Sequence, residues 1–89
     1  MKKELTLKLI DGVFDKSDTT DIILSMIDKK IEFNEMNSFR NLVKFNKKDM
    51  NLQSRIDELK KARMSFVEYI NLNKNENFNL ESEINIKII

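Results

Sequence analysis

The feature that most constrains the fold is a helical period in residues 49–73, DMNLQSRIDELKKARMSFVEYINLN. At about 100° per residue, one stripe along this segment is apolar and the opposite side is polar. Arg63 falls near the middle of the apolar stripe, where a charge is not expected. The segment therefore predicts an amphipathic helix of about 25 residues, ~37 Å long, with one anomaly on its buried face. The apolar stripe consists of Leu52, Ile56, Leu59, Phe66, Val67 and Ile70.

A chain of 89 residues predicts a single domain, residues 1–89, with a small core. The sequence contains no cysteine and no histidine, which excludes disulfides and the soft and imidazole ligands of structural zinc sites. Self-association is the remaining common way to enlarge so small a core. We therefore expect a homodimer or a higher oligomer.

The charge balance is nearly even, with 16 basic and 15 acidic residues and a net charge of +1. It gives no global signature of nucleic-acid binding. Apolar runs reach only three or four residues, which is too short for a membrane span. The N-terminal segment also lacks the apolar core of a signal peptide. We expect a cytoplasmic protein without a membrane partner.

Both ends of the sequence alternate apolar and polar residues, which predicts strands over residues 4–14 and 78–89. An Asp-Gly pair interrupts the first pattern. Only two apolar residues follow it, so we favour a bulge or kink at Gly12 over a tiny hairpin. The side of the first strand that we expect to be apolar carries Leu5, Leu7 and Leu9.

A shorter helix, which precedes the one at 49–73, is predicted over residues 18–36, with Ser17 or Asp18 as its N-cap. Its apolar residues cover more than half of the circumference, so we expect it to pack on two surfaces at once. These are the sheet and the other helix, or the other helix and a neighbouring subunit. Residues 37–48 keep some helical spacing but contain several asparagines, and we interpret them as a connector.

The order strand, helix, helix, strand predicts an α+β fold of β-α-α-β type. A long helical hairpin returns the chain to the end where it began, so the terminal strands should pair antiparallel and the hairpin should pack on them. Two strands alone make a poor sheet, and each leaves one edge open. We expect dimerisation to complete the fold, by edge pairing or by helix packing.

The opening LKLIDGVF is followed by an acidic cap, an aliphatic helix, a connector with Asn and Phe, and a charged second helix. This pattern resembles small uncharacterised proteins of bacteria and their mobile elements. The resemblance covers most of the chain through short motifs. It implies the strand-helix-helix-strand pattern and a phage or mobile-element origin, and it brings no agreed activity and no functional residue.

Catalytic chemistry has little support in this composition. The chain has no His or Cys, its one Gly excludes a Gly-rich phosphate loop, and no carboxylate pair lies in an apolar setting. We predict no enzyme, no catalytic residue, no cofactor and no metal. Carboxylates suited to calcium do occur, but their spacing does not match an EF-hand loop, and we interpret them as solvated groups near a helix cap. They are Asp11, Asp15, Asp18 and Asp21.

A basic patch, RNLVKFNKK, lies in the predicted connector, and Phe39 and Phe45 are interleaved with its basic residues. If the long helix begins near Lys47, two lysines lie at its positive end, and a bound phosphate would relieve them. If the helix begins at Asp49, the lysines are loop charges. The acidic stretch between Asp11 and Asp28 is another group that the patch could face.

Arg63 has two readings as well. It pairs with a carboxylate of the other predicted helix, or it lies at a subunit interface or ligand site together with Arg55. The carboxylates within reach in a hairpin are Asp28, Glu32 and Glu35. The candidate residues for binding an anion or a partner are Arg40, Lys44, Lys47, Lys48, Arg55 and Arg63.

We predict from these observations a non-enzymatic, homo-oligomeric protein-interaction module that docks through an exposed helix face or strand edge. The alternative is a protein that binds or sequesters an anionic ligand, a nucleotide or nucleic acid, through the basic connector and helix start. A salt titration separates the two, because affinity for phosphates falls steeply with salt.

Overall fold

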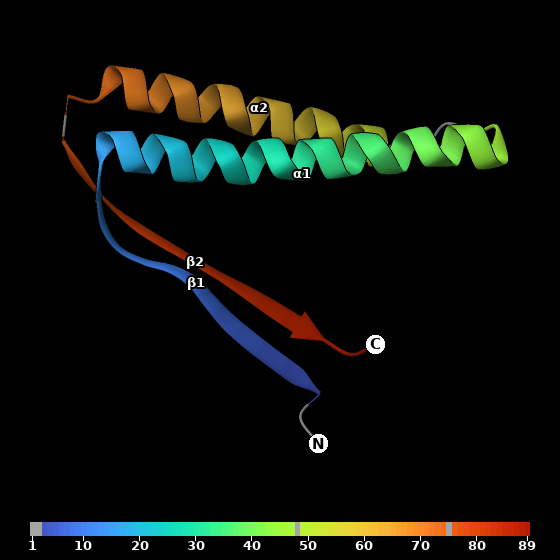
Figure 1. Cartoon of the computed structure of the whole chain (residues 1–89), viewed down its shortest axis with the longest axis horizontal. Coiled ribbons are helices and arrows are strands. Elements are labelled where there is room, and N and C mark those ends of the chain that lie inside the picture. Colours follow the sequence, from blue (N-terminus) through green and yellow to red (C-terminus); the bar gives the residue numbers. More distant parts are fainter. Residues whose placement is uncertain (1–2, 48, 75) are drawn as a thin grey trace. The chain divides into compact units, whose positions relative to one another are not determined.

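The computed structural model describes residues 3–47, 49–74 and 76–89. Its order is strand, helix, helix, strand, which confirms the predicted α+β class (Figure 1). The strands and the first turn of the first helix form one compact unit, and Thr20–Lys74 forms another. Across the described residues, no helix combines the length and the apolar character needed to cross a membrane. The elements are β1 (Glu4–Asp15), α1 (Lys16–Phe45), α2 (Met50–Leu72) and β2 (Asn77–Lys87).

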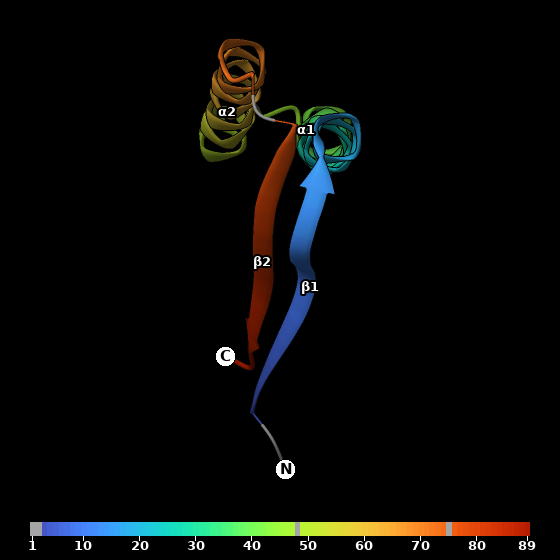
Figure 2. The same cartoon turned by 90° about the vertical axis from the view of Figure 1, so that its left-hand side faces the viewer.

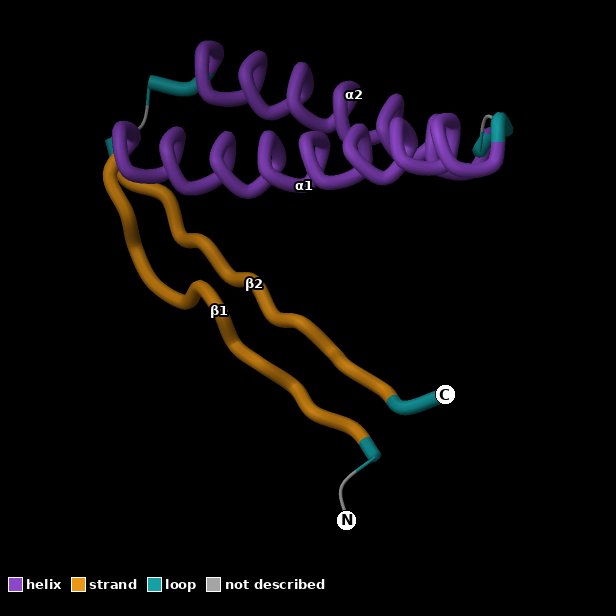
Figure 3. Tube along the Cα trace, turned by 45° about the vertical axis from the view of Figure 1, so that its right-hand side comes forward, coloured by secondary structure: helices purple, strands orange, loops and turns teal. Residues whose placement is uncertain are grey.

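The two strands pair antiparallel in a two-stranded ribbon, as predicted (Figure 2). The register shifts between Lys8 and Ile10, which leaves Leu9 without a cross-strand partner. The predicted site of the bulge, Gly12, is wrong: Gly12 pairs directly with Leu80. Figure 3 shows the corresponding bend in the course of β1.

The bulge at Leu9 changes which residues of β1 share a face. Directly paired residues lie on the same face of a sheet, so the extra residue moves the apolar pattern from odd to even positions. One face of the ribbon is therefore apolar along most of its length. Its paired residues are Leu5 with Ile86, Leu7 with Ile84, Ile10 with Ser82, Gly12 with Leu80, and Phe14 with Phe78.

The first helix is longer than predicted and begins earlier. Its N-cap is neither Ser17 nor Asp18, because the Asp15 carboxylate accepts a 2.7 Å hydrogen bond from the Asp18 backbone N–H. The helix continues for 30 residues, through most of the stretch predicted to be a connector. Asparagines lower helix propensity only modestly, so those within the stretch do not end the helix.

The two helices run antiparallel beside each other (Figures 1 and 2). The side of α2 that faces α1 follows an alternating four- and three-residue spacing, which is typical of two packed helices. Ile56 and Ile70 are buried on this side. Two ion pairs link the helices, Asp28 with Arg63 at 2.7 Å and Glu35 with Lys60 at 4.0 Å. The positions of α2 in this spacing are 52, 56, 59, 63, 66 and 70.

Candidate functional site

The far half of α1, residues 34–45, buries polar side chains and exposes apolar ones. Asn34 is only 5% exposed, whereas Phe39 is 67% and Val43 is 68% exposed. Asn34 continues the spacing of Ile31, which is buried in the rest of the helix, residues 16–33, the nearer half. The apolar side of α1 thus points away from α2 in this half. The exposed apolar residues of this half of α1 are Met36, Phe39, Leu42, Val43 and Phe45.

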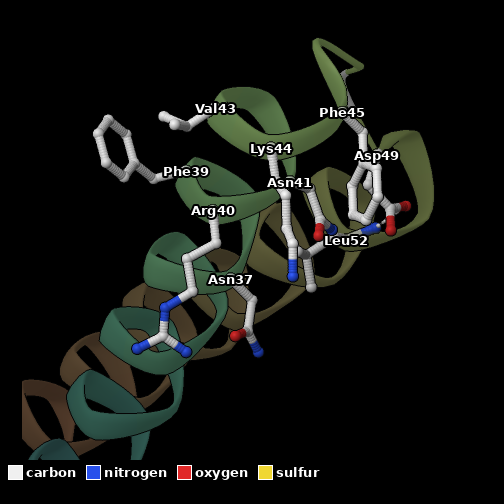
Figure 4. A pocket seen from close by; sticks show the side chains of 9 residues that line it. All are labelled: Asn37, Phe39, Arg40, Asn41, Val43, Lys44, Phe45, Asp49 and Leu52. Atoms are coloured by element: carbon white, nitrogen blue, oxygen red, sulfur yellow. Dashed lines mark hydrogen bonds between the residues drawn. The ribbon is translucent and has the colours of Figure 1, made fainter.

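Phe39, Val43 and Phe45 border an open hollow of about 730 Å³ near the turn between the helices. Figure 4 shows Arg40 and Lys44 extending to the same side of α1, whereas Phe39 and Val43 project from another side. Each pair is four residues apart, which places its members one above the other on a helix. A basic row therefore lies next to an apolar row. We call Met36, Phe39, Arg40, Val43, Lys44, Phe45 and Lys47 the tip surface.

The positive charges of the tip surface have little compensation within the hairpin. Among the described residues, no ion pair joins Arg40, Lys44 or Lys47 to an acidic side chain. The Lys44 Nζ lies 5.9 Å from the centroid of the Phe45 ring, a weak contact of cation and aromatic face. The charges of this surface are therefore open to an acidic ligand or partner.

An acidic side chain that lines the same hollow, Asp49, is the N-cap of α2. Its carboxylate accepts a 3.0 Å hydrogen bond from the Leu52 backbone N–H. The helix therefore begins at Met50, and Lys47 precedes it as a loop residue. Because a carboxylate already occupies the positive end of α2, the phosphate site considered for a helix that begins near Lys47 loses its basis.

The two remaining arginines of the predicted set are held elsewhere in the hairpin. Arg63 donates to Asp28 through Nε at 2.7 Å and through Nη2 at 3.4 Å. This hydrogen bond, and then the charge of Asp28, raise the pKa of the Arg63 guanidinium above its ordinary value. Arg55 pairs with Glu58 at 3.2 Å. The reading of Arg63 as an intramolecular partner of α1 is thus confirmed.

Of the six predicted binding residues, the structure brings Arg40, Lys44 and Lys47 together at the tip. Arg40 and Lys44 line the hollow, and Lys47 lines a neighbouring one of about 490 Å³. Lys48 lies outside the described residues. The site predicted from the sequence did not include Met36 or Val43, and it gave Phe39 only as a ring interleaved with the basic patch. Their spacing on the side opposite Asn34 and Asn41 was the signal that could have identified them.

The acidic residues near the start of α1 are used in local structure. Asp15 caps the helix, and Asp11 pairs with Lys8 at 3.3 Å. Within the described ranges, no three acidic side chains come close enough to hold a metal ion.

No family model, curated protein or solved structure matches this chain significantly. The mobile-element origin therefore stays a prediction.

Proposed function

We propose that this chain is a protein-interaction module without enzymatic activity, and that a partner protein docks on the tip surface. The observation that carries the proposal is the exposure of Phe39 and Val43 beside Arg40. Aromatic residues, Met and Arg are the types enriched in protein interfaces and in their hot spots. Four exposed apolar side chains at about 100 Å² each offer roughly 400 Å², a patch of the size that marks functional surfaces.

A photoreactive amino acid at position 43 tests this proposal in the cells that produce the protein. We expect Val43 replaced in this way to form one discrete adduct with another protein. A second substitution, Phe39→Ser, should abolish the adduct because it removes the neighbouring anchor. The matched control is Leu72→Ser on α2, since Leu72 is 80% exposed and lies outside the tip surface. Equal loss with both substitutions would contradict docking at the tip.

An anionic ligand is a second candidate, favoured by one observation. Arg40 and Lys44 extend side by side into the hollow of about 730 Å³, a volume suited to a nucleotide. Binding of ATP and of a single-stranded oligonucleotide, measured from 50 to 300 mM salt, separates the two functions. A steep loss of affinity with salt would support phosphate binding. No binding of either probe at 50 mM salt would leave the protein-docking proposal alone.

We propose that the chain also associates with itself, through the ribbon. The apolar face of the outer ribbon is open: Leu5 is 50%, Leu7 40%, Ile84 44% and Ile86 47% exposed. A two-stranded ribbon has two free edges and cannot bury its own apolar face. A second copy supplies both an edge and an apolar face.

Sedimentation tests the self-association. We expect a dimer at micromolar concentration and a monomer for Ile86→Lys, because a charge on the apolar face must be desolvated on association. The control Lys87→Glu alters the opposite, polar face of the same strand and should leave the dimer intact. A stable monomer of the unaltered protein would contradict this part of the proposal.

A further inference from the structure

The side of α1 that faces away from α2 has the chemistry of a contact surface, which a macromolecule of matching chemistry would cover. In residues 34–45 the buried positions are occupied by Asn34 and the half-buried Asn41, while Phe39 and Val43 lie in solvent. A helix that only completed the hairpin would place its apolar residues on the α2 side, as it does at Ile31. The reversed pattern indicates that the outer side of this half is the one built for contact.

The charge of the cover follows from the ion pairs of the hairpin. Acidic residues next to the apolar row already have partners: Glu35 faces Lys60 at 4.0 Å and Glu32 faces Lys29 at 3.8 Å. Asp49 is engaged at the start of α2. The basic row of Arg40 and Lys44, by contrast, has no such ion pair in the described ranges. A partner that balances this surface must therefore bring acidic groups.

A second copy of the same tip surface is a poor cover. Two copies packed tip to tip would place Arg40, Lys44 and Lys47 of one chain near the same bases of the other. Like charges brought together in an interface cost several kcal/mol. A pure phosphate ligand is also a poor cover, because it leaves Phe39 and Val43 in solvent. The cover must be both acidic and apolar.

We infer, resting on the proposed docking function, that the tip surface binds an acidic amphipathic helix of a partner protein. Phe39 and Val43 are four residues apart, as are Arg40 and Lys44, so two parallel rows run along α1. A partner helix with apolar residues at a three- and four-residue spacing and with acidic residues beside them matches both rows. The apolar row anchors the helix, and Arg40 and Lys44 select its charge.

Three synthetic peptides of about 18 residues, five helical turns, test the inference. The first has a leucine row flanked by glutamates, the second has the same row flanked by lysines, and the third keeps the glutamates but replaces leucine by serine. Fluorescence anisotropy with the full chain at 150 mM salt measures the dissociation constants. We expect the first peptide to bind at least about tenfold more tightly than either of the others.

Two substitutions locate the binding at the tip. Arg40→Glu should weaken the glutamate-flanked peptide at least about tenfold and strengthen the lysine-flanked peptide, a reversal that unfolding cannot produce. The matched control Lys61→Glu makes the same charge change on the exposed side of α2 and should leave both peptides unchanged. Phe39→Ser should weaken both peptides alike, and circular dichroism confirms that the variants remain helical.

Several outcomes would overturn the inference. These are equal affinity for the three peptides, no binding of the first peptide below 1 mM, and an equal effect of Arg40→Glu and Lys61→Glu. Self-association lost on Phe39→Ser would make a second copy the occupant instead. If the crosslink from position 43 persists while the acidic peptide fails, the docking function stands and only the acidic helical partner is excluded.

Discussion

The two halves of α1 belong to one continuous helix, yet they differ in what they place on the side that faces α2. In the nearer half, Ile31 is 9% exposed and lies on the side that faces α2. In the far half, the same side carries the buried Asn34, and Phe39 on the outer side is 67% exposed. The nearer half is organised to hold the hairpin together. In the far half, the apolar residues form a surface that the hairpin does not cover.

Helix formation and hairpin packing are therefore separate requirements. The far half is helical because its apolar residues keep helical spacing and because Lys44 suits the negative end of the helix dipole. Apart from Asn34, it contributes no buried residue to the contact with α2. A helix can thus extend beyond the part that stabilises the fold and present a separate surface there.

The largest expected effect comes from truncation in the nearer half. Ile31→Ala removes a buried side chain and leaves a cavity, so we expect a loss of about 3 kcal/mol in the free energy of unfolding. The matched change in the far half, Phe39→Ala, removes a larger but exposed side chain and should change it by less than about 0.5 kcal/mol. Urea denaturation followed by circular dichroism measures both. Similar losses would mean that the far half also stabilises the hairpin.

The sequence was sufficient for the fold class because its periods are local. Alternation of two marks the strands, and the stripe from Leu52 to Ile70 marks α2, whatever the rest of the chain does. The bulge could not be placed, because the shift at Leu9 depends on pairing with β2 and not on β1 alone. Gly12 is a local turn signal and does not mark the bulge. The change of the apolar pattern from odd to even positions after Leu7 indicates the bulge more directly.

A middle-sized effect should follow from Asn34→Leu. A buried Asn between two helices fixes their register and lowers their stability. We expect the substitution to raise the free energy of unfolding by about 1 kcal/mol, because an apolar side chain replaces an amide that is only 5% exposed. The measurement is urea denaturation together with sedimentation, which detects any new association of the helices.

Asn41→Leu serves as the control for Asn34→Leu, since Asn41 is half-buried and should respond less. A large loss of stability with Asn34→Leu would show that the amide makes a hydrogen bond that the hairpin needs. In that case the far half would be bound to α2 by polar contacts, and the contrast between the two halves would weaken.

Only part of the site could be predicted from the sequence, for a physical reason. A basic side chain is identified by its residue type alone, so the sequence predicts Arg40, Lys44 and Lys47 as binding residues. Whether Phe39 is core or surface depends on which side of α1 meets α2, a tertiary contact that the spacing within α1 does not specify. Asparagines suggested a connector at 37–48, although Asn37 and Asn41 are half-buried within α1 and Asn46 lies beyond its end.

The smallest effect is expected for Arg63→Met, which removes an ion pair between α2 and the nearer half of α1. Arg63 pairs with Asp28, but both side chains are about half exposed, 42% and 50%, so the solvent screens the pair. Met keeps the aliphatic contact of the stripe, and we expect a smaller change in the urea midpoint than for Asn34→Leu. Lys61→Met is the control away from the stripe.

The raised pKa of Arg63 adds stability that is lost only as the pH rises through that pKa. The urea midpoint should therefore not vary with pH between 6 and 9 on account of Arg63. A marked loss of stability would mean that the pair with Asp28, more than the apolar contacts near Ile31, fixes how the hairpin closes.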